Sequence, residues 1–162
     1  MKILQAVLLL LLIQDKPFPE ADPAEAIAAA KKRAAAENRR VLVVWGANDS
    51  EASRAIALML QKNREARKTI RYEFDLVLAD AHHSDLAKKL GADPAKLPWA
   101  TILAADWKPL ANVAAPADPK AMVELLLKHK AEPLIARDVL AAAFKRAAGE
   151  KKRILLTFGA PW

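Results

Sequence analysis

The chain has 162 residues, of which 54% are hydrophobic and 28% are charged, and its formal net charge is +7. This length and composition suffice for one domain with a buried core and some residues left over. The sequence contains no cysteine, which excludes disulfides, thiolate nucleophiles and cysteine metal sites from these residues. The lysines and arginines are spread over predicted helix surfaces without interleaved aromatic residues, so we expect a solubilising charge and no nucleic-acid partner.

The N-terminus has the pattern of a secretory signal. Lys2 precedes an apolar run from Ile3 to Ile13, which is shorter than the roughly 20 residues needed to span a bilayer. The residues Gln14-Asp15-Lys16 form no clear small-x-small cleavage site, so an uncleaved anchor is the alternative to a cleaved leader. We expect an exported chain with a leader over residues 1–15 and no other membrane contact. Residues 16–22 are rich in proline and predict an extended linker.

A first domain is predicted over residues 23–130, with four strands. Each strand is a short run of apolar or β-branched residues bounded by turn residues. These runs are Val41–Trp45, Glu73–Ala79, Leu97–Leu103 and Leu110–Ala114. The last two are joined by a turn at Asp106–Pro109 and predict an antiparallel hairpin, whereas helices separate the earlier strands.

Helices are predicted around these strands from their capping residues. The first has Asp22 as its N-cap and Pro23 in its first turn, and the last has Asp118 as its N-cap. The predicted helices are Ala24–Asn38, Ala52–Lys68, Ser84–Leu90 before Gly91, and Asp118–His129. Asn48 and Glu51 have the spacing of a capping box ahead of the second helix. This order of elements predicts an α/β fold, a mixed sheet of about four strands with helices on both faces.

The C-terminal residues repeat the start of the domain. Residues 138–162 align with residues 25–49 without a gap, and about half of the aligned positions are identical. The matches extend beyond the alanine-rich helix into the strand and the turn after it. A repeat of domain length predicts tandem copies of one domain. We therefore expect residues 131–162 to be the opening helix and the strand Ile154–Phe158 of a second domain, truncated in this chain.

Three landmarks in the first domain resemble the thioredoxin superfamily, in particular the thioredoxin-like domains of exported bacterial proteins. One is the strand, turn and helix start from Val41 to Ser53. Another is Leu97-Pro98-Trp99-Ala100-Thr101, which is similar to the family's strand entry with a cis-proline facing the active site. The last is the hairpin Ile102–Val113 with a helix after it. Leu155–Trp162 also looks like the family's run-up to its first cysteine. The resemblance implies a thioredoxin-like fold and a periplasmic or membrane-tethered protein.

The resemblance places the family's two cysteines at Ser50 and Ser53. Trp162 aligns with Asp49 in the repeat, so the motif here is Ser50-Glu51-Ala52-Ser53. Thiol–disulfide exchange needs a thiolate to attack and a disulfide to be attacked, and a serine hydroxyl supplies neither. We therefore expect this domain to have no dithiol chemistry and no catalytic residue, and we predict no cofactor.

Two other kinds of chemistry involve residues near this turn. Ser50 as a nucleophile would need a histidine base. The chain has three histidines, His82, His83 and His129. Zinc ligands are a second alternative, since Asp80, His82, His83 and Asp85 are close in sequence. The simpler interpretation is that the serines start a helix and that the histidines lie in an exposed loop. We favour it and predict no metal site.

The residues around the turn and the proline predict a surface for a peptide. Relatives in the resembled family bind extended backbone there, and the candidates are Trp45, Ser50, Pro98 and Trp99. Core packing is the competing interpretation for both tryptophans. The leading hypothesis is a redox-inactive thioredoxin-like domain in an exported protein with tandem domains of this kind. It would bind a protein or peptide partner or act as a scaffold, and its own second domain could be such a partner. The alternative is a thiol–disulfide oxidoreductase whose Cys-x-x-Cys follows Trp162.

Overall fold

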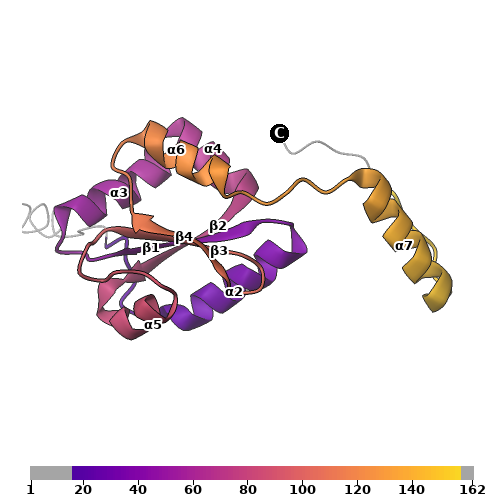
Figure 1. Cartoon of the computed structure of the whole chain (residues 1–162), viewed down its shortest axis with the longest axis horizontal. Helices are drawn as coiled ribbons and strands as arrows, with labels where there is room; N and C mark the ends of the chain where they lie inside the picture. The colour runs from indigo at the N-terminus through magenta and orange to yellow at the C-terminus, as the bar shows by residue number, and fades with distance from the viewer. Residues whose placement is uncertain (1–15, 158–162) are drawn as a thin grey trace, which may run out of the picture.

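Four strands form one mixed sheet in the computed structural model of the chain, which describes residues 16–157 (Figure 1). The strands are β1 (Arg40–Gly46), β2 (Phe74–Asp80), β3 (Trp99–Leu103) and β4 (Pro109–Ala114). Their order across the sheet is β2-β1-β3-β4. Each strand lies within two residues of its predicted bounds, and the mixed four-stranded sheet confirms the predicted fold class.

β1 lies at the centre of the sheet and is buried along nearly its whole length. It pairs in parallel with β2, where Gly46 is opposite Asp80, and antiparallel with β3, where Trp45 is opposite Trp99. The carboxyl ends of β1 and β2 therefore meet the amino end of β3 at one edge of the sheet. We call this the carboxyl edge. It comprises residues 46–50, 80–82 and 97–99.

Helices cover both faces of the sheet (Figure 1). The helices on one face are α3 (Glu51–Lys62), α4 (Arg64–Glu73) and α6 (Pro119–Lys128), and those on the other are α2 (Pro23–Ala36) and α5 (Ser84–Lys89). Successive residues of β1 point to opposite faces. Leu42 and Val44 belong to the core under α3, α4 and α6. Val41, Val43 and Trp45 belong to the core under α2 and α5.

Side-chain caps start the first and last helices of the domain as predicted. Asp22 Oδ1 accepts a hydrogen bond from the Ala24 N–H at 2.9 Å at the start of α2. Asp118 Oδ2 accepts one from the Ala121 N–H at 2.8 Å at the start of α6. Each cap satisfies a backbone donor that the helix itself leaves free. After α5, Gly91 has a φ of 82°, a left-handed conformation that glycine adopts without strain.

The single helix predicted over Ala52–Lys68 is wrong, because α3 and α4 divide this segment. Asn63 lies between them in an extended conformation, with φ −68° and ψ 125°. Its side-chain oxygen accepts hydrogen bonds from the N–H groups of Glu65 and Ala66, at 3.1 and 3.0 Å. Asparagine side chains cap helices well. The residues on both sides of Asn63 favour helix, so periodicity alone does not separate the two.

Phe18 anchors residues 16–22 to the domain, so the segment is not the free linker that the sequence predicts, although most of its residues are exposed. Phe18 has no exposed side-chain area and belongs to the core under α3, α4 and α6. The Phe18 N–H donates to Asn48 Oδ1 at 3.1 Å, and Asn48 Nδ2 donates to the Phe18 carbonyl at 2.7 Å. The ring lies over Gly46, where a Cβ would come within 2.3 Å of Phe18 Cζ. Burial of this large aromatic ring fixes a segment that has no regular secondary structure of its own.

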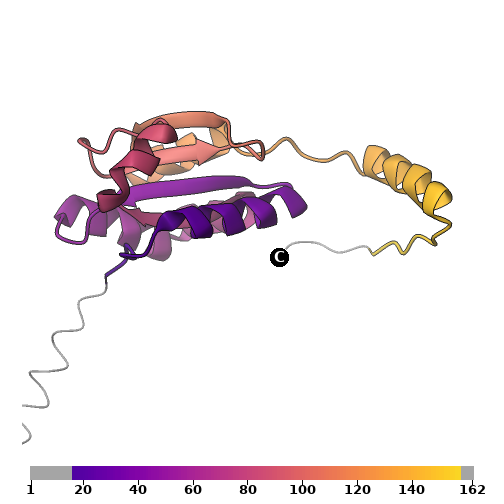
Figure 2. The same cartoon turned by 90° about the horizontal axis from the view of Figure 1, so that it is seen from below.

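α7 (Ala136–Glu150) follows the domain and lies apart from the sheet (Figures 1 and 2). It is the helix predicted to open the second copy. Of the predicted strand Ile154–Phe158, residues 154–157 have no regular secondary structure, because a strand needs a hydrogen-bonding partner and no strand in the described part of the chain pairs with them. Residues 158–162 and the predicted leader, residues 1–15, lie outside the described residues. The helices that the structure describes include none that is long and apolar enough to span a membrane.

Candidate functional site

The carboxyl edge brings together the residues that the sequence indicates around the turn and the proline. Ser50 follows β1 at the start of α3, and Pro98 precedes β3. Because Trp45 and Trp99 face each other in the antiparallel β1–β3 pair, the segments beyond them lie at the same edge. Asp80 ends β2 beside the end of β1. Ser50, Pro98 and Asp80 therefore come from three segments to one end of the sheet.

Ser50 is the N-cap of α3, and its Oγ accepts a hydrogen bond from the Ser53 N–H at 3.2 Å. The predicted capping box of Asn48 and Glu51 is therefore wrong. The N-cap is Ser50, two residues after Asn48, and the Asn48 side chain forms hydrogen bonds with the Phe18 backbone instead. Ser53 is fully buried, and its hydroxyl has no hydrogen-bond partner within the described chain. The two hydroxyls thus differ in role, since only the first stabilises the helix.

Alanine at these two positions should have opposite effects on stability. Ser50→Ala removes the cap of α3 and should lower the free energy of unfolding by about 1 kcal/mol. Ser53→Ala removes a buried hydroxyl without a partner, so the free energy of unfolding should stay the same or rise by up to about 1 kcal/mol. Urea unfolding followed by tryptophan fluorescence measures both changes. Equal losses in the two variants would contradict the assigned roles.

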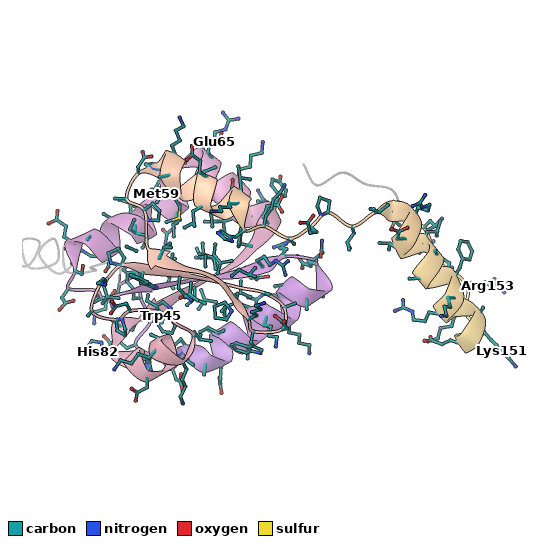
Figure 3. All side chains as sticks on the ribbon, in the orientation of Figure 1. Trp45, Met59, Glu65, His82, Lys151 and Arg153 are labelled. Carbon is teal, nitrogen blue, oxygen red and sulfur yellow. The ribbon has the colours of Figure 1, made fainter. Side chains whose placement is uncertain are left out.

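Trp45 is a core residue, so its prediction as a peptide-binding residue is wrong. Its side chain has no exposed area, and its Nε1–H donates to Thr101 Oγ1 at 3.2 Å. Figure 3 shows Trp45 among the side chains that fill the interior of the domain. The physical reason is the alternation along β1, which points this side chain under α2 and α5 together with those of Val41 and Val43.

Pro98 and Trp99 are half-buried at the carboxyl edge. The Leu97–Pro98 peptide bond is cis. The Pro98 carbonyl accepts a hydrogen bond from the Ala115 N–H at 2.9 Å, which fixes it beside the end of β4. Trp99 Nε1 is buried without a hydrogen-bond partner among residues 16–157. Of the four predicted peptide-binding residues, Ser50, Pro98 and Trp99 thus keep part of their surface exposed at this edge.

A cavity of about 470 Å³ adjoins the turn before Ser50. Its lining residues are Glu20, Asn48, Asp49, Asp80 and His82. Asp80 is buried, and its Oδ1 accepts a hydrogen bond from the His82 N–H at 2.8 Å and also contacts His82 Nδ1. Three carboxylates line this space, of which Glu20 forms an ion pair with Lys16 at 2.9 Å and Asp80 contacts His82, while Asp49 is exposed. We call this space the acidic cavity.

The imidazole of His82 should stay protonated to a higher pH than an ordinary histidine. The hydrogen bond to Asp80 and the attraction of its charge raise the pKa of His82, and Asp49 and Glu20 add to this attraction. Because the folded-state pKa is raised, the contact favours folding below the unfolded value of about 6.5 and is lost as the pH rises through the folded-state pKa. Proton NMR titration measures this pKa. Asp80→Asn should lower it, and an identical titration in both proteins would exclude the contact.

Neither of the other chemistries considered from the sequence has its geometry here. Ser50 Oγ caps α3, whereas His82 contacts Asp80 and His83 Nε2 lies 3.4 Å from the Glu20 carbonyl oxygen. Within the part of the chain that the structure describes, no group of three or more histidine, aspartate or glutamate side chains is placed to hold a metal ion. This edge of the sheet presents the partly exposed side chains of Ser50, Pro98 and Trp99 together with the acidic cavity.

Sequence reasoning missed Phe18 and Glu20, and it assigned Asn48 the wrong role. The available signal was an isolated large aromatic residue between two prolines, since such a side chain tends to be buried. No local pattern links Phe18 to Asn48, which lies 30 residues further along the chain. The acidic cavity depends on this contact, because the segment that holds Phe18 also carries Glu20 to the carboxyl edge.

The fold is similar to that of a solved structure described as a disulphide isomerase from Xylella fastidiosa Temecula1. The TM-score is 0.62 at 20% sequence identity, and the match covers 70% of this chain and 96% of that chain. At this identity the likeness shows the fold alone, and that fold is the thioredoxin-like α/β fold that the sequence predicts. No protein-family model matches the sequence, and a search of curated proteins finds no match.

Proposed function

We propose that this chain is a thioredoxin-like domain without dithiol chemistry, which binds an extended segment of a partner protein at the carboxyl edge. The observation that carries the proposal concerns the two motif positions. Ser50 and Ser53 stand at the start of α3, where the resembled family has cysteines, and the 162 residues contain no thiol. A serine hydroxyl neither attacks a disulfide nor forms one at neutral pH. What this edge retains is a surface for contact.

Binding is supported by the groups that the edge presents. Ser50, Pro98 and Trp99 are partly exposed and come from two adjacent segments. Because β1 and β3 are already paired on both sides, an extended peptide there would form its main-chain hydrogen bonds with the loops that flank the strand ends. In the acidic cavity beside Ser50, the exposed carboxylate of Asp49 suits the cationic end of a lysine or arginine side chain. The proposed ligand is therefore an extended segment with basic residues.

The N-terminal apolar run and the internal repeat support a place for this domain in an exported bacterial protein with a further domain of the same kind. In this proposal the domain binds its partner outside the cytoplasm and scaffolds the module that follows it. Mass spectrometry of the protein expressed in a bacterium tests the export. A periplasmic or membrane-bound chain is the expected result, and a cytoplasmic chain that retains Met1 would contradict it.

Site-specific photo-crosslinking tests the binding site. Benzoylphenylalanine replaces either Ala52 in the first turn of α3 or Glu65 in the first turn of α4, both of which are exposed. Figure 3 shows Glu65 on the other side of the sheet from His82, which lines the acidic cavity. The probe is a short peptide of alternating valine and lysine. Crosslinks from position 52 should exceed those from position 65 several-fold. Equal yields, or no crosslinks at all, would reject binding at the carboxyl edge.

Reduction of insulin tests the redox half of the proposal separately. The purified chain should not accelerate the reaction above the rate of dithiothreitol alone, because it has no thiol to relay electrons. Acceleration above this background would contradict a redox-inactive domain, whatever the outcome of the crosslinking.

A further inference from the structure

α7 and the residues after it repeat the local geometry of α2 and β1. In the ungapped alignment of residues 138–162 with residues 25–49, Lys151 matches Asn38. Both have a left-handed backbone, with φ of 51° and 53°. The next residue closes each turn by donating to the carbonyl five residues earlier. These bonds are Arg39 N–H to Ala34 O at 2.8 Å and Lys152 N–H to Ala147 O at 2.9 Å. Both helices therefore end in the same Schellman-type turn.

The buried stripe of α2 also recurs on α7. It consists of Ile27, Ala30 and Ala34 in α2 and of the aligned Leu140, Ala143 and Ala147 in α7. The α2 residues are buried in the core, whereas the three aligned residues of α7 are half-buried and the rest of that helix is exposed. The segment 152–157 turns back along α7 (Figure 2). A hollow of about 500 Å³, lined by Ala143, Ala147 and Ile154 among others, lies between helix and segment.

The two copies differ in what covers the strand position. Leu42 and Val43 of β1 are fully buried, but the aligned Leu155 and Leu156 are 88% and 53% exposed. In the first copy β2 and β3 flank β1, and helices cover both faces. Successive residues of an extended segment point to opposite faces. Leu155 and Leu156 therefore present an apolar side chain to each face, as a central strand does.

We propose that residues 136–157 are the opening helix and strand of a second domain of this fold. The surface that carries Leu155 and Leu156 binds two strands of such a domain, a β2-like strand in parallel on one side and a β3-like strand antiparallel on the other. The partner is therefore a polypeptide segment that contains strands and helices equivalent to those that follow β1 in the first domain. This inference rests on the repeat, the matching turn and the exposed leucines, and it stands apart from peptide binding at the carboxyl edge.

An extended chain tests the proposal. Because Trp162 aligns with Asp49, residues 50–130 of this sequence are appended directly after Trp162 to supply the missing elements. Hydrogen exchange is then measured on the amides of residues 153–157 in both chains. In the original chain they should exchange at nearly the unprotected rate. In the extended chain they should exchange at least about 100-fold more slowly, because strand pairing protects amides, while the β1 amides of the first domain are unchanged.

Two matched variants of the extended chain make the result specific. Leu155→Asp with Leu156→Asp should abolish the gained protection, whereas Leu134→Asp, at an exposed leucine outside the repeat, should leave it intact. Absence of any gained protection in the extended chain overturns the proposal. Protection in the original chain that increases with protein concentration also overturns it, because a second copy of the chain would then be what covers the segment.

Discussion

Replacing Phe18 with alanine should lower the free energy of unfolding by roughly 3–5 kcal/mol. The ring is fully buried, and its backbone is fixed by two hydrogen bonds with the Asn48 side chain. Typical domains have a free energy of unfolding of about 5–15 kcal/mol, so this one side chain contributes a large share of the domain's stability. Urea unfolding measures the loss, and the thermal midpoint should fall by more than about 10 °C.

Phe144 provides the matched control for this change. It lies on α7 and its side chain is 58% exposed. Phe144→Ala deletes the same atoms from the surface and should change the free energy of unfolding by no more than about 0.5 kcal/mol. An effect of Phe18→Ala as small as that of Phe144→Ala would mean that residues 16–22 are a linker after all.

Gly46 offers an independent check on the position of the Phe18 ring. A Cβ at Gly46 would come within 2.3 Å of Phe18 Cζ, so Gly46→Ala should cost about 1–3 kcal/mol of stability. The cost should shrink when Phe18→Ala is also present, because the clash is then gone. Additive costs would show that the ring lies elsewhere.

Cysteines at positions 50 and 53 should give the chain a working dithiol. Residues three apart at the start of a helix lie on one face, and the N-terminus of α3 favours a thiolate. In the variant Ser50→Cys with Ser53→Cys, oxidised glutathione should accept two electrons. The two thiols then form one intramolecular disulfide, with release of two molecules of reduced glutathione. Alkylation followed by mass spectrometry counts the free thiols, which should fall from two to none.

The single variant Ser50→Cys is the control for this exchange. It has one thiol, so it should form only a mixed disulfide with glutathione. A double variant that also stops at mixed disulfides would show that the two positions do not have the geometry of the resembled site. The original chain should be unchanged by the same treatment, because it contains no cysteine.

The strands and the first and last helix starts could be predicted because they depend on residues close together in sequence. Val41–Trp45 is a continuous apolar run, and it forms the central part of β1. Asp22 and Asp118 precede prolines at helix starts, and both cap as predicted. The position of Ser50 and Pro98 at one edge was instead implied by the resemblance to the thioredoxin superfamily, and the β1–β3 pairing brings their segments together there.

The errors concern contacts that local patterns do not encode. Phe18 is buried by elements far along the chain, so a segment rich in proline appeared to be a linker. Asn63 divides a run of helix-forming residues with its own side chain. The Trp45 side chain points to one face of the sheet, and the packing of the helices on both faces decides which residues of β1 point to which face. The acidic cavity joins three such segments, so only the folded chain reveals it.

The most direct test of the central claim is an NMR titration of the folded chain with the short valine–lysine peptide. Binding at the carboxyl edge predicts the largest backbone amide shift changes at residues 47–53 and 97–100, with little change in α7. Glutamate in place of lysine in the peptide should weaken these changes, because the acidic cavity would repel it. Shift changes centred on α7 or residues 152–157, or none at millimolar peptide, would contradict a peptide-binding function at this edge.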